Sequence, residues 1–257
     1  MLFAADIGNS SVSFGVFDET GTLLLKSKVD AVKTKSADEY AVLISGILTL
    51  YRFDPSRITH GILCSVVSPL TRAVREALEH LFHITPMEVG PGIKTGLNIL
   101  IDLQPQLGAD LVANAVAATA KYPAPLVIAD MGTATTFTVI NREGILEGVI
   151  ICPGVRVSLN ALAEYGSELP DTSIAPPKRL IGTNTKDSMR SGVLCGHAAM
   201  TDGLIARIRS ELKTDELHVI ATGGLAGTVL PYCAEPIEYS PDLTLTGLYQ
   251  LFLKNKK

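Results

Sequence analysis

The chain has 257 residues, a formal net charge of -4 at pH 7 and 47% hydrophobic residues, with a mean hydropathy of +0.30. This composition is typical of a compact globular protein and excludes an intrinsically disordered one. The acidic balance offers no electrostatic footprint for nucleic acid, and no stretch approaches the length of an apolar membrane span. We therefore expect neither nucleic acid nor a membrane as a partner.

The four cysteines, Cys64, Cys152, Cys195 and Cys233, are widely separated and form no Cys-x-x-Cys pair. Their neighbours are apolar or small, which predicts buried free thiols rather than disulfides or metal ligands. The N-terminus has no basic lead, and Asp6 interrupts what would be the apolar core of a signal peptide. These features predict a cytoplasmic protein.

The first half begins with three short segments of strand-like pattern, at residues 2–6, 13–17 and 22–29. Ser36, with Glu39 three positions later, forms a capping box that predicts a helix ending at Leu50. An apolar strand at 58–65 follows, and Ser68-Pro69 opens a second helix. Residues 85–108 are rich in Pro and Gly, so we expect them to form a connection that lines a binding cleft.

A helix from Leu111 to Lys121 leads into a second copy of this plan. Strands are expected at 126–130, 135–141 and 146–151, helices at 155–165 and 185–212, and a further strand at 218–222. We place the boundary inside the helix that starts at Leu111, which gives domains 1–114 and 115–257.

One short pattern follows the first strand of each half. Asp6 and Gly8 recur as Asp130 and Gly132, 124 positions later, and the same offset aligns Ser11 with Thr135. The acid can hold a cation, the glycine admits a phosphate to the backbone, and hydroxyls can donate hydrogen bonds. In the second half the candidate hydroxyls belong to Thr133, Thr135 and Thr136.

A single Asp-x-Gly after a strand is more often an ordinary tight turn than a phosphate site. Two such turns, in register at the first strands of two similar halves, favour phosphate binding. The chain contains no Gly-x-x-x-x-Gly-Lys-Ser/Thr stretch, which excludes a P-loop enzyme.

Two modules of three strands, each with an Asp-x-Gly turn, resemble the acetate and sugar kinase, Hsp70 and actin superfamily. The resemblance implies an α/β fold with two ribonuclease H-like domains, each a mixed sheet flanked by helices, and a nucleotide cleft between them. It also implies that the turn at Gly223 and Gly224 supports the adenosine of ATP.

Within this superfamily the chain resembles the type III pantothenate kinases over nearly its whole length. The resemblance rests on Asp6-Ile-Gly-Asn-Ser, Thr34 with Ala37-Asp38-Glu39-Tyr40, Ser65-Val-Val, Gly108-Ala-Asp, Asp130-Met-Gly-Thr-Ala-Thr-Thr, Gly148-Val-Ile with Pro153-Gly154, Gly182-x-Asn184-Thr185 and Ala221-Thr-Gly-Gly-Leu. It implies ATP-dependent phosphorylation of pantothenate to 4'-phosphopantothenate, the first step of coenzyme A biosynthesis. A homodimer is implied as well, and magnesium would accompany ATP.

The family match also implies roles for single residues. Thr133 would contact ATP, Asp130 would hold potassium or ammonium, and Thr185 would reach the substrate across the dimer interface. The first ATP phosphate loop would consist of Asp6, Ile7, Gly8, Asn9, Ser10, Ser11, Val12 and Ser13.

The same match assigns Gly108, Ala109, Asp110 and Leu111 to the substrate pocket, with Asp110 as the general base. A carboxylate that accepts the proton of a primary alcohol can direct its oxygen at the γ-phosphoryl group. Asp110 heads a predicted helix, whose positive end favours the ionised form. From the residues alone, Asp110 is equally well explained as a helix cap.

Two positions depart from the family pattern. Leu111 stands where the family has Arg, and Ile101 stands where it usually has Tyr, so an aliphatic side chain replaces a polar contact at each. The loss of a hydrogen bond to a charged group costs roughly 1.5 to 3 kcal/mol. Three functions remain open: a pantothenate kinase with a drier pocket, a kinase for a more apolar alcohol, and a nucleotide-binding regulator without turnover. In the first, Arg156 is a candidate for the polar contact that is lost.

Overall fold

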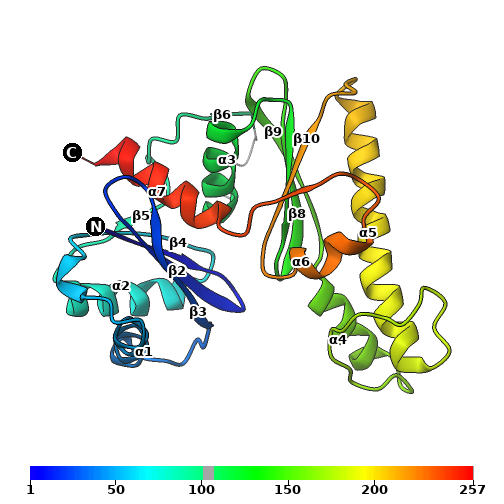
Figure 1. Cartoon of the computed structure of the whole chain (residues 1–257), viewed down its shortest axis with the longest axis horizontal. Helices are drawn as coiled ribbons and strands as arrows, with labels where there is room; N and C mark the ends of the chain where they lie inside the picture. Colours follow the sequence, from blue (N-terminus) through cyan, green and yellow to red (C-terminus); the bar gives the residue numbers. More distant parts are fainter. Residues whose placement is uncertain (101–106, 257) are drawn as a thin grey trace. The chain divides into compact units, whose positions relative to one another are not determined.

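The computed structural model describes residues 1–100 and 107–256. Two compact units make up the chain, and each contains one mixed sheet with helices packed on it (Figure 1). The first unit comprises Met1–Gly96, the described residues up to Ala120 and the segment that begins at Asp242. The second comprises residues 97–100 and Lys121–Pro241. The predicted α/β fold with two helix-flanked mixed sheets is confirmed.

The sheet of the first unit has five strands in the order β3-β2-β1-β4-β5. β1 pairs with β2 in antiparallel and with β4 in parallel orientation, so it is hydrogen-bonded on both edges. A strand in this central position is buried on both faces, which explains its apolar sequence. The five strands span Leu2–Ile7 (β1), Ser11–Phe17 (β2), Leu23–Asp30 (β3), His60–Ser65 (β4) and Met87–Glu88 (β5).

Helices α1 (Ala37–Leu50) and α2 (Ser68–Phe82) cover one face of this sheet (Figure 1), and the 3-10 turn η1 (Pro55–Arg57) lies between them in the chain. The predicted capping box is present, because the Ser36 side chain accepts from the Glu39 N–H and the Glu39 carboxylate accepts from the Ser36 N–H. The buried core on this face includes Phe3, Phe14, Tyr40, Ile44, Leu70 and Leu78.

Helices α3 (Ala109–Lys121) and α7 (Leu243–Asn255) pack against each other. The Thr244 hydroxyl donates to Asn114 Oδ1 at 2.8 Å. α7 lies on the sheet face opposite α1 and α2, where Tyr249 stacks on Phe17. The division at residue 114 assigned this C-terminal segment to the second half, whereas its packing groups it with the first sheet.

The sheet of the second unit has the order β11-β10-β7-β8-β9-β6. β8 pairs in antiparallel orientation with both β7 and β9, and β10 joins β7 in parallel. The strands span Asn98–Ile99 (β6), Leu126–Met131 (β7), Ala134–Ile140 (β8), Ile145–Pro153 (β9), His218–Thr222 (β10) and Glu238–Tyr239 (β11).

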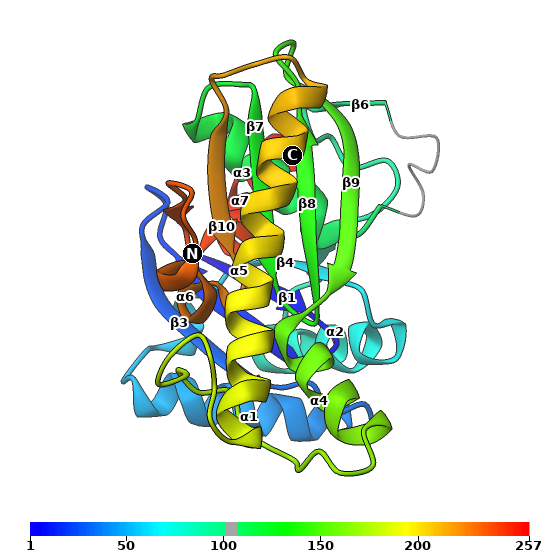
Figure 2. The same ribbon diagram turned by 90° about the vertical axis from the view of Figure 1, so that its right-hand side faces the viewer.

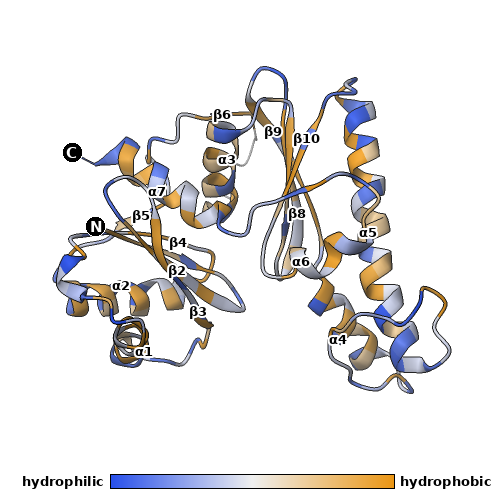
Figure 3. Cartoon of the chain, in the orientation of Figure 1, coloured by the Kyte–Doolittle hydropathy of each residue, from blue (hydrophilic) through white to orange (hydrophobic). Residues whose placement is uncertain are grey.

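The long helix α5 (Thr185–Glu211) covers one face of this second sheet, with α4 (Val155–Tyr165) beside its first turns (Figure 2). Hydrophobic colour concentrates in the strands, while α5 carries both hydrophobic and hydrophilic stretches (Figure 3). The core on this face joins Val127, Ala129, Met131 and Phe137 to Leu194 and Ala198. Two short elements follow β10, namely α6 (Ala226–Val229) and the 3-10 turn η3 (Leu230–Tyr232).

The predicted repeat is visible in the strand order, because β3-β2-β1-β4-β5 corresponds to β9-β8-β7-β10-β11. Asp6 and Asp130 each lie one residue before the end of the first strand. The alignment of Ser11 with Thr135 is wrong by one residue, since the turn after β1 is one residue longer than the turn after β7. Asp6 pairs with Ser13, and Asp130 pairs with Thr136.

All four cysteines are free, as predicted, but only Cys64 is fully buried, while Cys152, Cys195 and Cys233 are partly exposed. In the part of the chain that the structure describes, no helix is long and apolar enough to cross a membrane.

Candidate active site

The turn between β1 and β2 contains the predicted first phosphate loop. It is closed by a hydrogen bond from the Gly8 N–H to the Ser11 carbonyl oxygen at 2.9 Å. Asn9 and Ser10 are exposed at its tip, whereas the side chains of Ile7 and Val12 are buried in the core. Ile7 and Val12 can therefore offer a ligand only main-chain groups, while the tip can offer side chains as well.

Asp6 lies beside Cys64, its register partner on β4. The Cys64 thiol donates to Asp6 Oδ1 at 3.3 Å. Burial, and then the negative charges of Asp6 and Asp110, raise the pKa of Cys64 well above its usual value. The thiol thus stays protonated. Since the charges of Asp6 and Asp110 both act on it, the two acids lie in one region of the first unit.

Asp110 is the second residue of α3 and not the residue before the helix. Its Oδ1 accepts a hydrogen bond from the Leu111 N–H at 2.9 Å. Burial raises the pKa of Asp110, although this hydrogen bond and one within the residue oppose the shift. Asp110 therefore binds a first-turn amide of the helix and is at the same time more basic than an exposed aspartate.

Three turns converge at the predicted second phosphate loop. The Gly154 N–H donates to the Thr133 carbonyl oxygen at 3.1 Å, and the Leu225 N–H donates to the Met131 carbonyl oxygen at 3.1 Å. Gly223 has φ +93°, and a Cβ there would lie 2.5 Å from Asp130 Oδ1. Only glycine fits this approach. The predicted Gly-Gly turn thus packs directly on the Asp130 turn.

The three threonine hydroxyls of this loop have different surroundings. Thr133 is exposed at the turn, as a contact for a ligand requires. Thr135 is fully buried, and its Oγ1 lies 2.7 Å from Nε2 of His197 on α5. The expectation that Thr135 donates to a phosphate is wrong, because alternation along β8 turns its side chain into the core. Thr136 faces the other side, and its Oγ1 is buried without a hydrogen-bond partner among the described residues.

The residues assigned to the substrate pocket fall into three groups. Gly108, Ala109 and Asp110 are half-buried at the start of α3, and Leu111 is only 8% exposed. Thr185 is exposed as the first residue of α5, after the helix cap Asn184. Ile101 lies outside the described residues.

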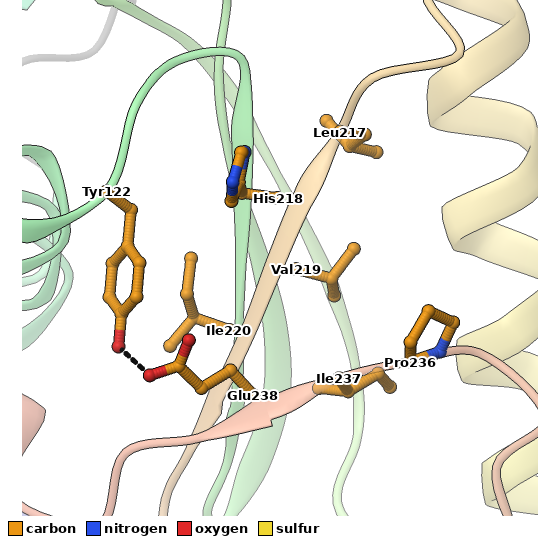
Figure 4. Close-up of a pocket in the computed structure, with 8 residues that line it drawn as sticks. All are labelled: Tyr122, Leu217, His218, Val219, Ile220, Pro236, Ile237 and Glu238. Atoms are coloured by element: carbon orange, nitrogen blue, oxygen red, sulfur yellow. Dashed lines mark hydrogen bonds between the residues drawn. The ribbon is translucent and has the colours of Figure 1, made fainter.

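A groove of about 430 Å³ lies at the β10–β11 edge of the second sheet (Figure 4). On one side the Tyr122 hydroxyl donates to Glu238 at 2.5 Å, and Lys121 Nζ donates to the same carboxylate at 3.1 Å. The lining consists of Tyr122, Leu217, His218, Val219, Ile220, Pro236, Ile237 and Glu238. Because none of the predicted site residues is among them, this groove is not the candidate active site.

Sequence reasoning missed two residues that support the predicted turns. Cys64 lies in β4, which pairs in parallel with β1 and places Cys64 opposite Asp6. The contact between them could have been predicted only if this pairing had been known. His197 lies 62 positions from Thr135, and no motif joins them. Among the described residues, no group of three or more His, Cys, Asp or Glu side chains could hold a metal ion.

The two repeated sheets with their Asp-x-Gly turns define a member of the acetate and sugar kinase, Hsp70 and actin superfamily. The sequence profile of type III pantothenate kinase matches residues 2–207. The chain belongs to the type III pantothenate kinase family.

Sequence relatives extend this match to the whole chain. A type III pantothenate kinase of Shouchella clausii is 39% identical over 256 residues and covers 100% of both chains. The type III pantothenate kinase of Pelobacter propionicus is 40% identical over 257 residues, again with 100% of each chain covered.

Two solved structures with low sequence identity support the fold. Component A of the (R)-2-hydroxyglutaryl-CoA dehydratase of Acidaminococcus fermentans has a TM-score of 0.54 at 16% identity and covers 96% of this chain and 94% of its own. The ethanolamine utilization protein EutJ of Carboxydothermus hydrogenoformans has a TM-score of 0.55 at 14% identity, with 98% and 89% covered. The nucleotide cleft expected between the two halves stays a prediction.

Proposed function

We propose that this protein transfers the γ-phosphoryl group of ATP to pantothenate and produces 4'-phosphopantothenate, the first step of coenzyme A biosynthesis. Family membership over the full length supports the reaction. The observation that carries the proposal is a buried, more basic Asp110 in the same unit as the Asp6 turn. The Cys64 thiol donates to Asp6, and the charge of Asp110 also acts on this thiol. A base and a phosphate turn in one unit are the two parts that an alcohol kinase needs.

In this proposal the two Asp-x-Gly turns supply the groups that bind ATP. Asn9 and Ser10 contribute exposed side chains, Ile7 and Val12 contribute main-chain groups only, and Thr133 contributes an exposed hydroxyl. Gly223 and Gly224 support the adenosine. Gly223 also allows its turn to approach Asp130 closely, so the nucleotide-supporting turn and the cation-holding acid adjoin each other.

Asp110 acts as the general base. A carboxylate whose pKa is raised by burial accepts a proton more readily than an exposed one, provided that the pH keeps it ionised. The hydroxyl proton of pantothenate passes to Asp110 as the oxygen attacks the γ-phosphorus, the bond from this phosphorus to the β,γ-bridging oxygen breaks, and ADP leaves. The hydrogen bond from the Leu111 N–H holds Oδ1 in place during this step. In this proposal Oδ2 takes up the proton.

Asp130 and Thr136 fit a monovalent cation. They are paired across β7 and β8, and the buried Thr136 Oγ1 has no hydrogen-bond partner among the described residues. A carboxylate and a neutral hydroxyl oxygen suit potassium or ammonium, and oxygen ligands of this kind are those that hard cations take. When bound, the cation supplies positive charge beside the phosphates of ATP, while magnesium accompanies the nucleotide itself.

Asp130→Ala is expected to remove the dependence of the rate on potassium, because it deletes the only charged ligand of the proposed cation site. The measurement is the initial rate of ATP turnover against potassium concentration, with sodium replacing potassium at constant ionic strength. Thr136→Val should leave a weaker potassium response, since it removes the neutral ligand alone. A rate that still rises with potassium in Asp130→Ala would locate the cation elsewhere.

The second unit carries several exposed apolar side chains near α4 and the start of α5, and we propose that they form a homodimer interface. It includes Tyr165 at 83%, Ile181 at 77% and Leu180 at 70% exposure, together with Val157 and Leu162 of α4. Exposed apolar patches of this kind mark interaction sites, and Thr185 follows Ile181 closely in the chain. We expect a dimer in analytical ultracentrifugation, and Tyr165→Glu with Ile181→Glu should shift the protein to monomers. A wild-type monomer at micromolar concentration would remove the proposed interface.

Leu111 favours a second candidate function, the phosphorylation of a more apolar alcohol. This buried aliphatic side chain adjoins the proposed base, where the family pattern has Arg. The deciding experiment measures ATP turnover with pantothenate and with a panel of small alcohols, in the presence of magnesium and potassium. Turnover with pantothenate at ordinary efficiency supports the first function, and turnover with another alcohol alone supports the second. ATP binding without any turnover would indicate a nucleotide-binding regulator.

A further inference from the structure

His197 lies in the middle of α5 with its ring turned toward the sheet. The side chain is 6% exposed, and Nε2 lies 2.7 Å from the hydroxyl of the fully buried Thr135. The main chain of His197 is held as well, because the Thr201 hydroxyl donates to its carbonyl oxygen at 2.9 Å. The ring is therefore a fixed group that reaches from α5 to the beginning of β8.

Thr135 is adjacent to the second phosphate turn. It pairs with Met131 on β7 and with Cys152 on β9. The residue before it, Ala134, accepts the hydrogen bond that closes the turn, from the Gly132 N–H at 3.0 Å. A bond that fixes the Thr135 side chain thus fixes the end of the turn that carries Thr133.

We propose that His197 is a positioning residue for ATP binding, which acts through Thr135 on the turn at residues 132–134. The inference rests on the proposed function, since it assigns this turn to ATP. His197 touches neither the nucleotide nor the reacting atoms in this proposal. Its role is to hold the turn in the conformation that presents the Thr133 hydroxyl and the turn amides.

The first half of the molecule shows that the fold itself does not require this polar pair. Val12 pairs with Ile7 as Thr135 pairs with Met131, so Val12 occupies the equivalent position, and it is 1% exposed. An apolar side chain fills that place well. Burial of a hydroxyl and an imidazole is unfavourable unless they bond to each other, so the pair at the second turn serves something other than packing.

The state of the ring agrees with this role. Burial lowers the pKa of His197, so the imidazole is uncharged at neutral pH. A neutral ring offers one donor and one acceptor nitrogen, and Nε2 can take either part with a hydroxyl.

The test compares Thr135→Val, His197→Leu and the double variant with wild type, and measures ATP affinity by calorimetry, KM for ATP and the melting temperature. Thr135→Val and His197→Leu should each weaken ATP binding by about 5-fold, the equivalent of one buried hydrogen bond. The double variant should bind ATP as tightly as the single variant with the lower affinity, because both changes break the same hydrogen bond. Thr135→Ser keeps the hydroxyl and should restore most of the affinity.

Thr138→Val is the matched control, since Thr138 is a 1% exposed threonine of the same strand whose hydroxyl makes no hydrogen bond among the described residues. It should leave ATP affinity unchanged. The inference is overturned if Thr135→Val and His197→Leu bind ATP as wild type does, or if Thr138→Val weakens binding equally. Calorimetry separates this failure from that of the proposed function: a wild type that binds ATP but does not phosphorylate pantothenate refutes the function alone, and one that binds no ATP refutes both.

Discussion

Asp110→Asn is expected to abolish phosphoryl transfer to pantothenate and to leave ATP binding intact. The amide keeps an oxygen that can accept from the Leu111 N–H, so the local structure is preserved. It cannot take up the hydroxyl proton, and the loss of a general base lowers the rate by about 100- to 10,000-fold. The measurements are kcat with pantothenate and the affinity for ATP by calorimetry.

The pH dependence of the wild type follows from the same residue. Because burial raises the pKa of Asp110, kcat/KM should fall as the pH drops through this raised value and the base becomes protonated. The folded state also binds the Asp110 proton more tightly than the unfolded state does. Stability therefore decreases as the pH rises from the unfolded pKa through the folded one, and the loss persists at neutral pH.

Asp110→Asn should accordingly raise the melting temperature at pH values above the raised pKa of Asp110, where wild type carries a buried charge, and should change it less in acid, where Asp110 is protonated. A control is Asp54→Asn, an exposed aspartate that also accepts from a nearby N–H, that of Ser56 at 3.0 Å. This variant should leave the rate unchanged. It should not raise the melting temperature at pH 7, because hydrogen bonds from Ser56 lower the pKa of Asp54 and favour its charged form. An active Asp110→Asn enzyme would show that Asp110 only binds the end of the helix.

The sequence predicted those elements whose patterns are local. The capping box at Ser36 and Glu39 located the start of α1, and the apolar segment of residues 218–222 matched β10. Helix α4 was predicted with the bounds Val155–Tyr165 that the structure has. In each case hydrogen bonds or burial within one element determine where that element begins and ends. The residues next to each other in the chain are therefore enough to predict its bounds.

What depends on distant partners could not be predicted. Nothing in residues 243–255 indicated that α7 packs on the first sheet, because that contact relies on Tyr249 meeting Phe17 and on Gly247 approaching Ala113. The assignment of Thr135 to a phosphate failed for a similar reason. Because the turn after β7 is one residue shorter than the turn after β1, Thr135 corresponds to the buried Val12 and not to Ser11. His197 could be recognised as the partner of Thr135 only once α5 was placed on the sheet.

Gly154→Ala is expected to impair ATP binding and to destabilise the second unit. Gly154 has φ -74° and ψ 165°, which alanine adopts without strain, so the effect comes from crowding alone. A Cβ at this position would overlap the carbonyl oxygens of Gly132 and Thr133 and lie 2.8 Å from the Thr133 carbonyl carbon. These are backbone atoms of the second phosphate turn, so the turn itself has to move.

Overpacking of this kind costs about 1 to 3 kcal/mol of stability, and the displaced turn no longer presents Thr133 correctly. Thermal unfolding and ATP calorimetry measure the two effects separately. Gly192→Ala provides the control, because a Cβ there meets nothing within 4 Å in the middle of α5, and alanine should stabilise that helix by about 0.5 to 1 kcal/mol. If Gly154→Ala binds ATP like wild type despite a lower melting temperature, the turn at residues 132–134 serves the fold and not the nucleotide. If both quantities change together, the position of this turn sets the affinity for ATP, and His197 and Gly154 hold it from two sides.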